Sequence, residues 1–203
     1  MKSILFCFLF LFLAQGCTRL IIMKEGIKQP DLEDYNSLSN FLLKIKVDTS
    51  ELLCFKDTIA LNKFFKMKIG MPESQFFNSE KKLVDYRESP KDCNGQVSVF
   101  LEKAEIVNQK TPVSDEFLEK YLKDLVYVKN QQPFTIGQEK NDLYLVMYWA
   151  KYLGKINKRK VFEWLNLVED ARKRGLKIRV LKINADYQQF WGLKKDDLPQ
   201  FVY

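Results

Sequence analysis

Residues 143–149, with the sequence LYLVMYW, are nearly continuously apolar. A run of this kind is typical of a β-strand that is covered on both faces. Residues 156–173 follow with apolar side chains at helical spacing, and the basic residues 172–174 and then Gly175 suit a helix C-terminus. Residues 176–183 are rich in β-branched side chains and predict a second strand. Together the three segments predict a βαβ unit with parallel strands and a right-handed crossover.

The rest of the chain predicts a mixture of helices and strands around this unit. Asp57 can cap a helix, Pro72 can open one, and Ser114 can cap another after a boundary near residues 108–112. We expect helices over residues 32–43, 58–65, 72–80, 114–125 and 187–191, and strands over residues 52–56, 97–101 and 200–203. The expected class is therefore α/β, with the βαβ core in the C-terminal half and a smaller mixed α+β region before it.

The composition allows a real core and excludes some chemistry. The 203 residues are 46% hydrophobic and 14% aromatic, with only 8 Gly and 6 Pro, so the chain is not a disordered one. Histidine is absent, which excludes His-based triads, His general bases and His metal ligands. Two acidic clusters, at residues 31–34 and 196–197, lack the spacing of an EF-hand or a paired-carboxylate site and are expected to be loop and cap residues. We expect no cofactor and no metal.

The N-terminus, MKSILFCFLFLFLAQGC, predicts the location of the protein. A single basic residue, an apolar run over residues 4–13 and a small polar segment before Cys17 follow the order of a secretory signal. The apolar run is shorter than the roughly 20 residues that a membrane-spanning helix needs. The ending LAQGC also resembles the lipobox of bacterial lipoproteins, although the favoured leucine stands one place early. The resemblance implies cleavage before Cys17, lipid on Cys17, and a protein held at the cell envelope.

The charge and the cysteines fit that compartment. Without Lys2 the mature chain has 32 basic and 26 acidic residues, a balance that suits an anionic lipid surface, an acidic protein or an ordinary solvated surface. Nucleic acid is not an expected partner. Of the four cysteines, Cys7 leaves with the signal and Cys17 is expected to carry lipid, so Cys54 and Cys93 remain as a pair in an oxidising compartment. We expect a structural disulfide between them, with two buried free thiols as the alternative.

The sequence after the apolar strand, YWAKYLGKINK over residues 148–158, resembles the membrane-tethered redoxins of bacterial envelopes, which are thioredoxin-like proteins. Those proteins have a strand ending in Phe-Trp-Ala, then a Trp-Cys-x-x-Cys motif and a basic residue that opens a long helix. In this chain Leu153 and Ile156 stand at the two cysteine positions, and Gly154 keeps the glycine between them. Neither side chain can attack or form a disulfide, so the resemblance implies a redox-inactive domain.

Further residues carry expectations from the same resemblance. The segment around Leu198-Pro199 resembles the approach to the family's cis-proline strand, so we expect Pro199 to be cis. The family continues past that strand with another strand and a closing helix, whereas this sequence ends at Tyr203. Three explanations for the missing strand and helix stay open. The N-terminal region covers the last strand in their place, a partner covers it, or the gene is truncated.

The helix start is also strongly basic. Lys155, Lys158, Arg159 and Lys160 lie in the first turns, where the helix dipole disfavours cations. They form a possible docking patch for an acidic partner or lipid headgroups, or an ordinary solvated face.

These observations together predict a lipid-anchored protein that acts by binding. The predicted divisions are a signal peptide (1–16), a lipidated tether (17–30), a mixed α+β region (31–110) and a degenerate thioredoxin-like domain (111–203). We expect the lipid to hold the chain at the outer membrane, facing the periplasm, where an envelope protein is the expected partner. The alternatives are a divergent thiol–disulfide oxidoreductase that uses Cys54 and Cys93, and a truncated remnant without function. The oligomeric state is not predicted.

Overall fold

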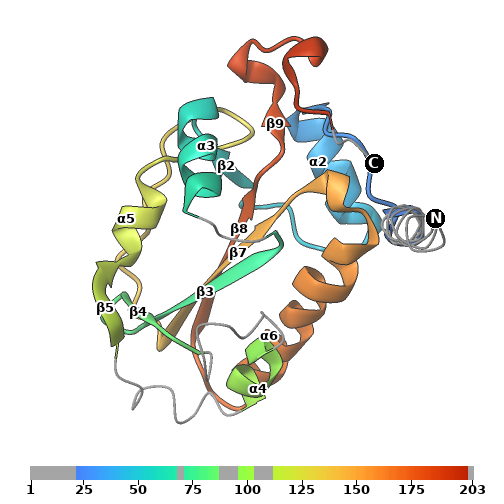
Figure 1. The fold of residues 1–203 in the computed structure, drawn as a ribbon. Coiled ribbons are helices and arrows are strands. Elements are labelled where there is room, and N and C mark those ends of the chain that lie inside the picture. The colour runs from blue at the N-terminus through green and yellow to red at the C-terminus, as the bar shows by residue number, and fades with distance from the viewer. Residues whose placement is uncertain (1–21, 68–70, 87–95, 103–111, 201–203) are drawn as a thin grey trace, which may run out of the picture.

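The computed structural model of the chain describes residues 22–67, 71–86, 96–102 and 112–200 (Figure 1). The predicted α/β class is confirmed, because helices in these ranges pack around a seven-stranded mixed sheet. Across the sheet the strands are β5 (Pro112–Phe117), β4 (Lys82–Val84), β3 (Glu73–Asn78), β7 (Leu143–Trp149), β8 (Ile178–Asn184), β2 (Leu53–Phe55) and β6 (Leu125–Tyr127). The helices include α2 (Tyr35–Lys44), α3 (Thr58–Lys66), α4 (Gln96–Glu102), α5 (Leu118–Leu122) and α6 (Glu163–Lys173), and residues 22–25 are helical as well.

Strand β7 runs through the middle of this sheet, and all seven of its residues are buried. Successive side chains of a strand point to opposite faces. Leu145 and Trp149 therefore pack with residues of α2, α4 and α6, while Tyr144 and Tyr148 pack with residues of α3 and α5. Figure 1 shows α4 and α6 on one side of the sheet and α3 and α5 on the other. The apolar run is continuous because both faces of the strand are covered.

The predicted βαβ unit is present. Strands β7 and β8 are parallel, in register from Leu143↔Ile178 to Trp149↔Asn184. They are joined by a π-helical stretch, η3 (Asn157–Phe162), that continues into α6. Gly175, at φ +100°, follows the helix as predicted.

Strands from both predicted regions are interleaved in one sheet. Residues 31–110 and 111–203 therefore share that sheet. Strand β3 pairs antiparallel with β7, and β2 pairs parallel with β8. The central strands need hydrogen-bonded neighbours on both sides, and the N-terminal half supplies them. The predicted boundary at 108–112 lies almost wholly outside the described residues.

Several local predictions are wrong for a common reason, including the start of the helix expected over residues 187–191, because Tyr187–Gln188 form the short strand β9. Residues 73–78, expected to be helical, form β3 along the full length of β7, whereas residues 97–101, expected to be a strand, lie in α4. Residues 112–117 form β5 before the short helix α5, where one longer helix was expected. Tertiary pairing and burial outweighed weak local propensity at each place.

The prediction for Pro199 is also wrong. In the ranges that the structure describes, the cis peptide bond is Met71–Pro72, immediately before β3. The expected last strand, residues 200–203, lies mostly outside the described ranges, and Gln200 itself is not in a strand. Among the described helices, none has the length and apolar character needed to cross a bilayer.

Candidate functional site at the helix start

The carboxyl ends of β7 and β8 meet at one edge of the sheet, because the two strands are parallel. In open α/β sheets this edge is where ligand sites are usually built. The chain leaves β7 through a short 3-10 turn, η2 (Lys151–Leu153), and leaves β8 toward a two-residue strand, β9 (Tyr187–Gln188). A buried polar network, an ion-pair group and the start of the long helix therefore lie together here.

The polar network is centred on Asp186, which is 2% exposed. Its Oδ2 accepts a hydrogen bond from the Lys151 backbone N–H at 2.6 Å and one from Asn184 Nδ2 at 2.7 Å. Its Oδ1 accepts a longer bond of 3.5 Å from the Tyr152 backbone N–H. The carboxyl group thus fixes the direction in which the chain turns after β7.

Burial raises the pKa of Asp186 from 3.8 to about 7, because desolvation disfavours the charged carboxylate. The Glu33 carboxylate adds to this rise, while the hydrogen bonds from Lys151, Asn184 and Tyr152 lower the pKa. The Asp186 carboxyl therefore changes its charge near neutral pH.

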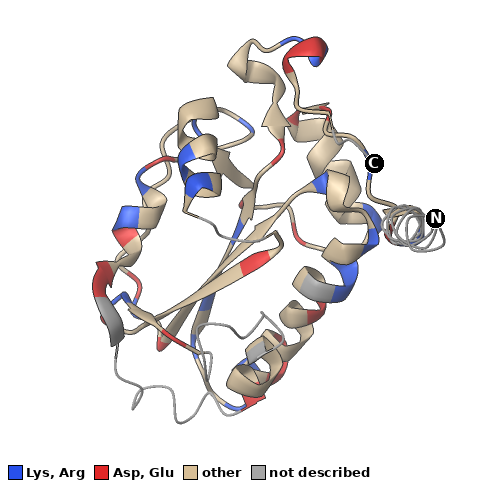
Figure 2. Cartoon of the chain, in the orientation of Figure 1, with Lys and Arg blue, Asp and Glu red and all other residues tan. Residues whose placement is uncertain are grey.

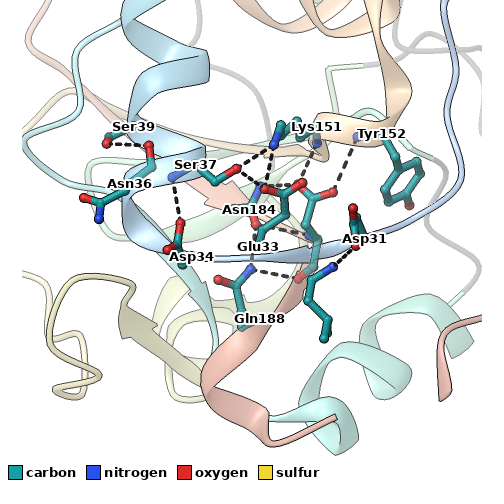
Figure 3. Close-up of polar contacts among 12 residues, drawn as sticks. Asp31, Glu33, Asp34, Asn36, Ser37, Ser39, Lys151, Tyr152, Asn184 and Gln188 are labelled. Atoms are coloured by element: carbon teal, nitrogen blue, oxygen red, sulfur yellow. Dashed lines mark hydrogen bonds and ion pairs between the residues drawn. The ribbon is translucent and has the colours of Figure 1, made fainter. Parts of the chain in front are cut away.

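Asn184 and Gln188 complete the network, and both are fully buried. The Gln188 Nε2 donates to Asn184 Oδ1 and to the Asp186 carbonyl, each at 2.8 Å (Figure 3). Gln188 Oε1 has no hydrogen-bond partner within the described part of the chain. The network is closed to solvent and joins β8, β9 and the turn after β7.

An ion-pair group lies beside this network. Lys151 Nζ is 2.7 Å from Glu33 Oε2 and donates to Ser37 Oγ at 2.6 Å, and the Ser37 hydroxyl donates to the same carboxylate oxygen (Figure 3). Glu33 is 6% exposed and lies in β1 (Leu32–Glu33), which pairs with β9. Asp34 caps α2 by accepting from the Ser37 N–H at 2.7 Å. These contacts fix the N-terminal part of the chain to the turn after β7.

The two positions that the predicted resemblance aligns with the redoxin cysteines lie at the start of the long helix. Leu153 ends η2 and is 8% exposed, and Ile156 is half-buried. Between them, Gly154 has φ +56°, a conformation that side chains rarely adopt. A Cβ atom at Gly154 would lie 2.2 Å from the Gly26 carbonyl oxygen. The backbone of an N-terminal segment therefore rests directly on Gly154.

That segment, residues 22–28, is named here the N-terminal strap. The Lys28 N–H donates to the Tyr152 carbonyl at 2.9 Å, and Lys155 Nζ donates to the Lys24 carbonyl at 3.2 Å. Glu25, 8% exposed, forms an ion pair with Arg159. The predicted tether is thus packed against the domain over these residues, while Cys17 and the predicted signal lie outside the described residues.

Two residues of the predicted docking patch contact the N-terminal strap. Lys155 and Arg159 make these contacts, and Lys155, Lys158 and Arg159 are all exposed. The side chain of Lys160 lies outside the described part. Figure 2 shows Lys and Arg gathered at the first turns of this helix.

At Cys54 the structure contradicts the predicted Cys54–Cys93 disulfide. Cys54 is a free thiol in β2, with 0% exposure, and its burial raises its pKa to about 12. Cys93 lies outside the described residues. Cys54 is surrounded by the core because β2 has a neighbouring strand on each side.

Sequence reasoning missed the network because its members come from separate segments. Within residues 31–34, Asp34 is the expected cap, but Glu33 is a buried ion-pair partner. The available signal was the polar sequence at residues 184–186, directly after a buried strand. In the described ranges no group of three or more acidic or cysteine side chains is arranged to hold a metal ion.

In comparisons with protein-family models, curated proteins and solved structures, nothing matches this chain. The fold and the site define an α/β protein with a closed polar network and a covered helix start at one edge of its central sheet.

Proposed function

We propose that the chain is a lipid-anchored envelope protein, held at the outer membrane facing the periplasm, whose redox-inactive thioredoxin-like domain binds a partner protein. The signal-like N-terminus with Cys17 supports the anchor, and the sequence around Trp149 supports the domain assignment.

The strand arrangement supports the thioredoxin-like assignment. Strand β3 follows Pro72, runs antiparallel to β7, and is followed by β4 and then α4 on the same face as α6. The resemblance implies such a strand, strand and helix, but after the βαβ unit. In this chain they come before it. Of the three explanations for the missing strand and helix, this arrangement favours the one in which the N-terminal region takes their place.

The covered helix start is the observation that carries the redox-inactive part of this proposal, and the assignment to binding rests on it. Thiol exchange needs an accessible thiolate at this helix N-terminus. Leu153 and Ile156 stand there instead, and the N-terminal strap lies on Gly154 between them. Cys54 is buried within the sheet, which disfavours the oxidoreductase alternative.

The anchor is tested by mass spectrometry of the protein purified from bacterial membranes. The expected result is a chain that begins at Cys17 and carries acyl groups, whereas Cys17→Ser is unacylated. An unmodified wild-type Cys17 would refute the anchor.

The binding assignment is tested with an insulin-reduction assay and with crosslinking in the envelope. We expect no reductase turnover, and we expect the same crosslinked partner for the wild type and for Cys54→Ser, because no thiol is used. Turnover, or a partner lost in Cys54→Ser, would favour the oxidoreductase alternative. Absence of any partner, together with no effect of deleting the gene, would favour the remnant alternative.

A further inference from the structure

The N-terminal strap and the helix start that it contacts carry several exposed basic side chains and one exposed apolar side chain. The membrane-side face, as it is named here, consists of Met23, Lys24, Lys28, Lys155 and Lys158. Met23 is 77% exposed, and the four lysines are exposed as well. Surfaces that lie in the headgroup layer of a membrane combine lysines with exposed apolar side chains, and Met23 beside these lysines has that character on a small scale.

The acidic residues nearest to these lysines in the sequence are already paired, and Asp31, three residues after Lys28, forms an ion pair with Lys195. Glu25 is buried against Arg159, so its charge is already paired. Glu163, in the first turn of α6, is the next acidic residue along the helix and lies more than a turn beyond Lys158. The face therefore keeps a positive charge that complements an anionic surface.

The distance to the proposed lipid places this face near a bilayer. Ile22, where the described chain begins, follows Cys17 by five residues. Fully extended, those residues span at most about 18 Å. A lipid on Cys17 would thus hold the bilayer within that reach of the N-terminal strap.

The strap is fixed to the domain, so the orientation of the domain follows from the position of the strap. Its Lys28 N–H is bonded to the Tyr152 carbonyl, and Glu25 is paired with Arg159. Because the strap is bonded to the helix start, a bilayer within about 18 Å of Ile22 would also lie close to the helix start.

We propose that the membrane-side face lies against anionic phospholipid headgroups, with the Met23 side chain entering the boundary of the acyl chains. This inference rests on the proposed lipid anchor at Cys17. Anionic lipid, rather than an acidic protein, is the occupant that both the short reach from Cys17 and the exposed Met23 favour.

The test uses the acylated protein in vesicles of phosphatidylcholine, with or without phosphatidylglycerol. Hydrogen exchange of the backbone amides is measured in residues 22–28 and 155–159. We expect exchange several-fold slower with the anionic lipid, and no such slowing at high salt. The double variant Lys24→Glu/Lys158→Glu should lose the slowing, because each lysine near an anionic surface strengthens binding about fivefold.

A matched control carries the same charge change at the opposite end of the sheet. Lys140 and Lys177 are exposed and precede β7 and β8, so Lys140→Glu/Lys177→Glu should keep the slowing. Equal exchange in both kinds of vesicle, or an equal loss in the two double variants, would overturn the proposal. So would a crosslinked protein partner that is lost in Lys24→Glu/Lys158→Glu while lipid has no effect, because that result would assign the face to an acidic protein.

Failure of the anchor is distinguished by the mass of the same preparation. If the purified chain carries no acyl group, its sedimentation with anionic vesicles is compared between the two double variants. Lysine-dependent sedimentation would support the face while refuting the anchor, and its absence would refute both.

Discussion

The Asp186 carboxyl joins two turns that are 35 residues apart in the sequence, through its bond to the Lys151 N–H. Both of its short hydrogen bonds end on Oδ2, so one oxygen atom holds the turn after β7 to the end of β8. The sequence shows only an acidic residue just after a strand. Burial, which gives this residue its raised pKa, depends on β1, η2 and β9 closing around it.

The raised pKa of Asp186 predicts a pH-dependent stability. Since the folded state holds the proton up to about pH 7 and the unfolded state releases it near 3.8, this group destabilises the fold as pH rises between those values. Between about pH 5 and pH 7.5 we expect the free energy of unfolding to fall by on the order of 2–3 kcal/mol. Above the folded pKa the dependence levels off. Urea denaturation over this pH range measures it.

Asp186→Asn should remove this slope, because a single amide oxygen can keep both short hydrogen bonds and the amide does not titrate. The matched control is Asp196→Asn, the same change at an exposed carboxylate, which should keep the wild-type slope. Equal slopes in the wild type and Asp186→Asn would contradict the assignment.

At the scale of elements, the sequence correctly predicted the helices and strands whose hydrophobic pattern is long and regular. β7, α6 and β8 follow from an apolar run, a helical spacing with a glycine stop, and a β-branched run. β3 and α4 were predicted in the opposite classes, because short segments depend on their partners for their secondary structure. β3 is a strand because it pairs with β7 along six residues, and without it that edge of β7 would have no hydrogen-bonded neighbour.

The packing of the N-terminal strap on the helix start gives a second prediction. Gly154→Ala should displace the strap, because the new Cβ would overlap the Gly26 carbonyl. We expect the Lys28 amide, bonded to Tyr152, to lose its protection from hydrogen exchange. A stability loss of roughly 1–3 kcal/mol should accompany the change.

Gly192→Ala is the matched control. Gly192 also has a positive φ, +73°, but a Cβ there would meet open space. Gly192 lies in the left-handed αL region, with ψ 14°, so this variant carries the smaller cost of a positive φ without a steric overlap, and the Lys28 amide should stay protected. Protection of that amide in both variants would show that the strap does not depend on Gly154.

At the scale of the whole molecule, the sheet combines strands from both halves of the chain. The order β5-β4-β3-β7-β8-β2-β6 places N-terminal strands on both sides of the βαβ unit. This interleaving places β2 between β8 and β6, and Cys54 within β2 is 0% exposed.

The burial of Cys54 predicts slow reaction with thiol reagents. Because its pKa is raised from 9.0 to about 12, its thiolate fraction at neutral pH falls about a thousandfold, and burial adds a steric barrier. Peptide mass spectrometry after alkylation should show Cys54 labelled only under denaturing conditions. A cysteine introduced by Ser50→Cys, at a nearby exposed position, should label in the native state.

Fast native labelling of Cys54, or its recovery in a disulfide-linked peptide with Cys93, would contradict the buried free thiol. The disulfide would restore the original prediction from the cysteine count.

By itself, the sequence determined the α/β class, the central βαβ unit and the absence of cysteine at positions 153 and 156, because these depend on local pattern and residue identity. The tertiary structure decided which strands flank β7, how Asp186 and Glu33 become buried, and where the N-terminal strap lies. The physical reason is the same in each case. Pairing, desolvation and close backbone contact join residues far apart in the chain, and no local pattern records which distant segment will supply the partner.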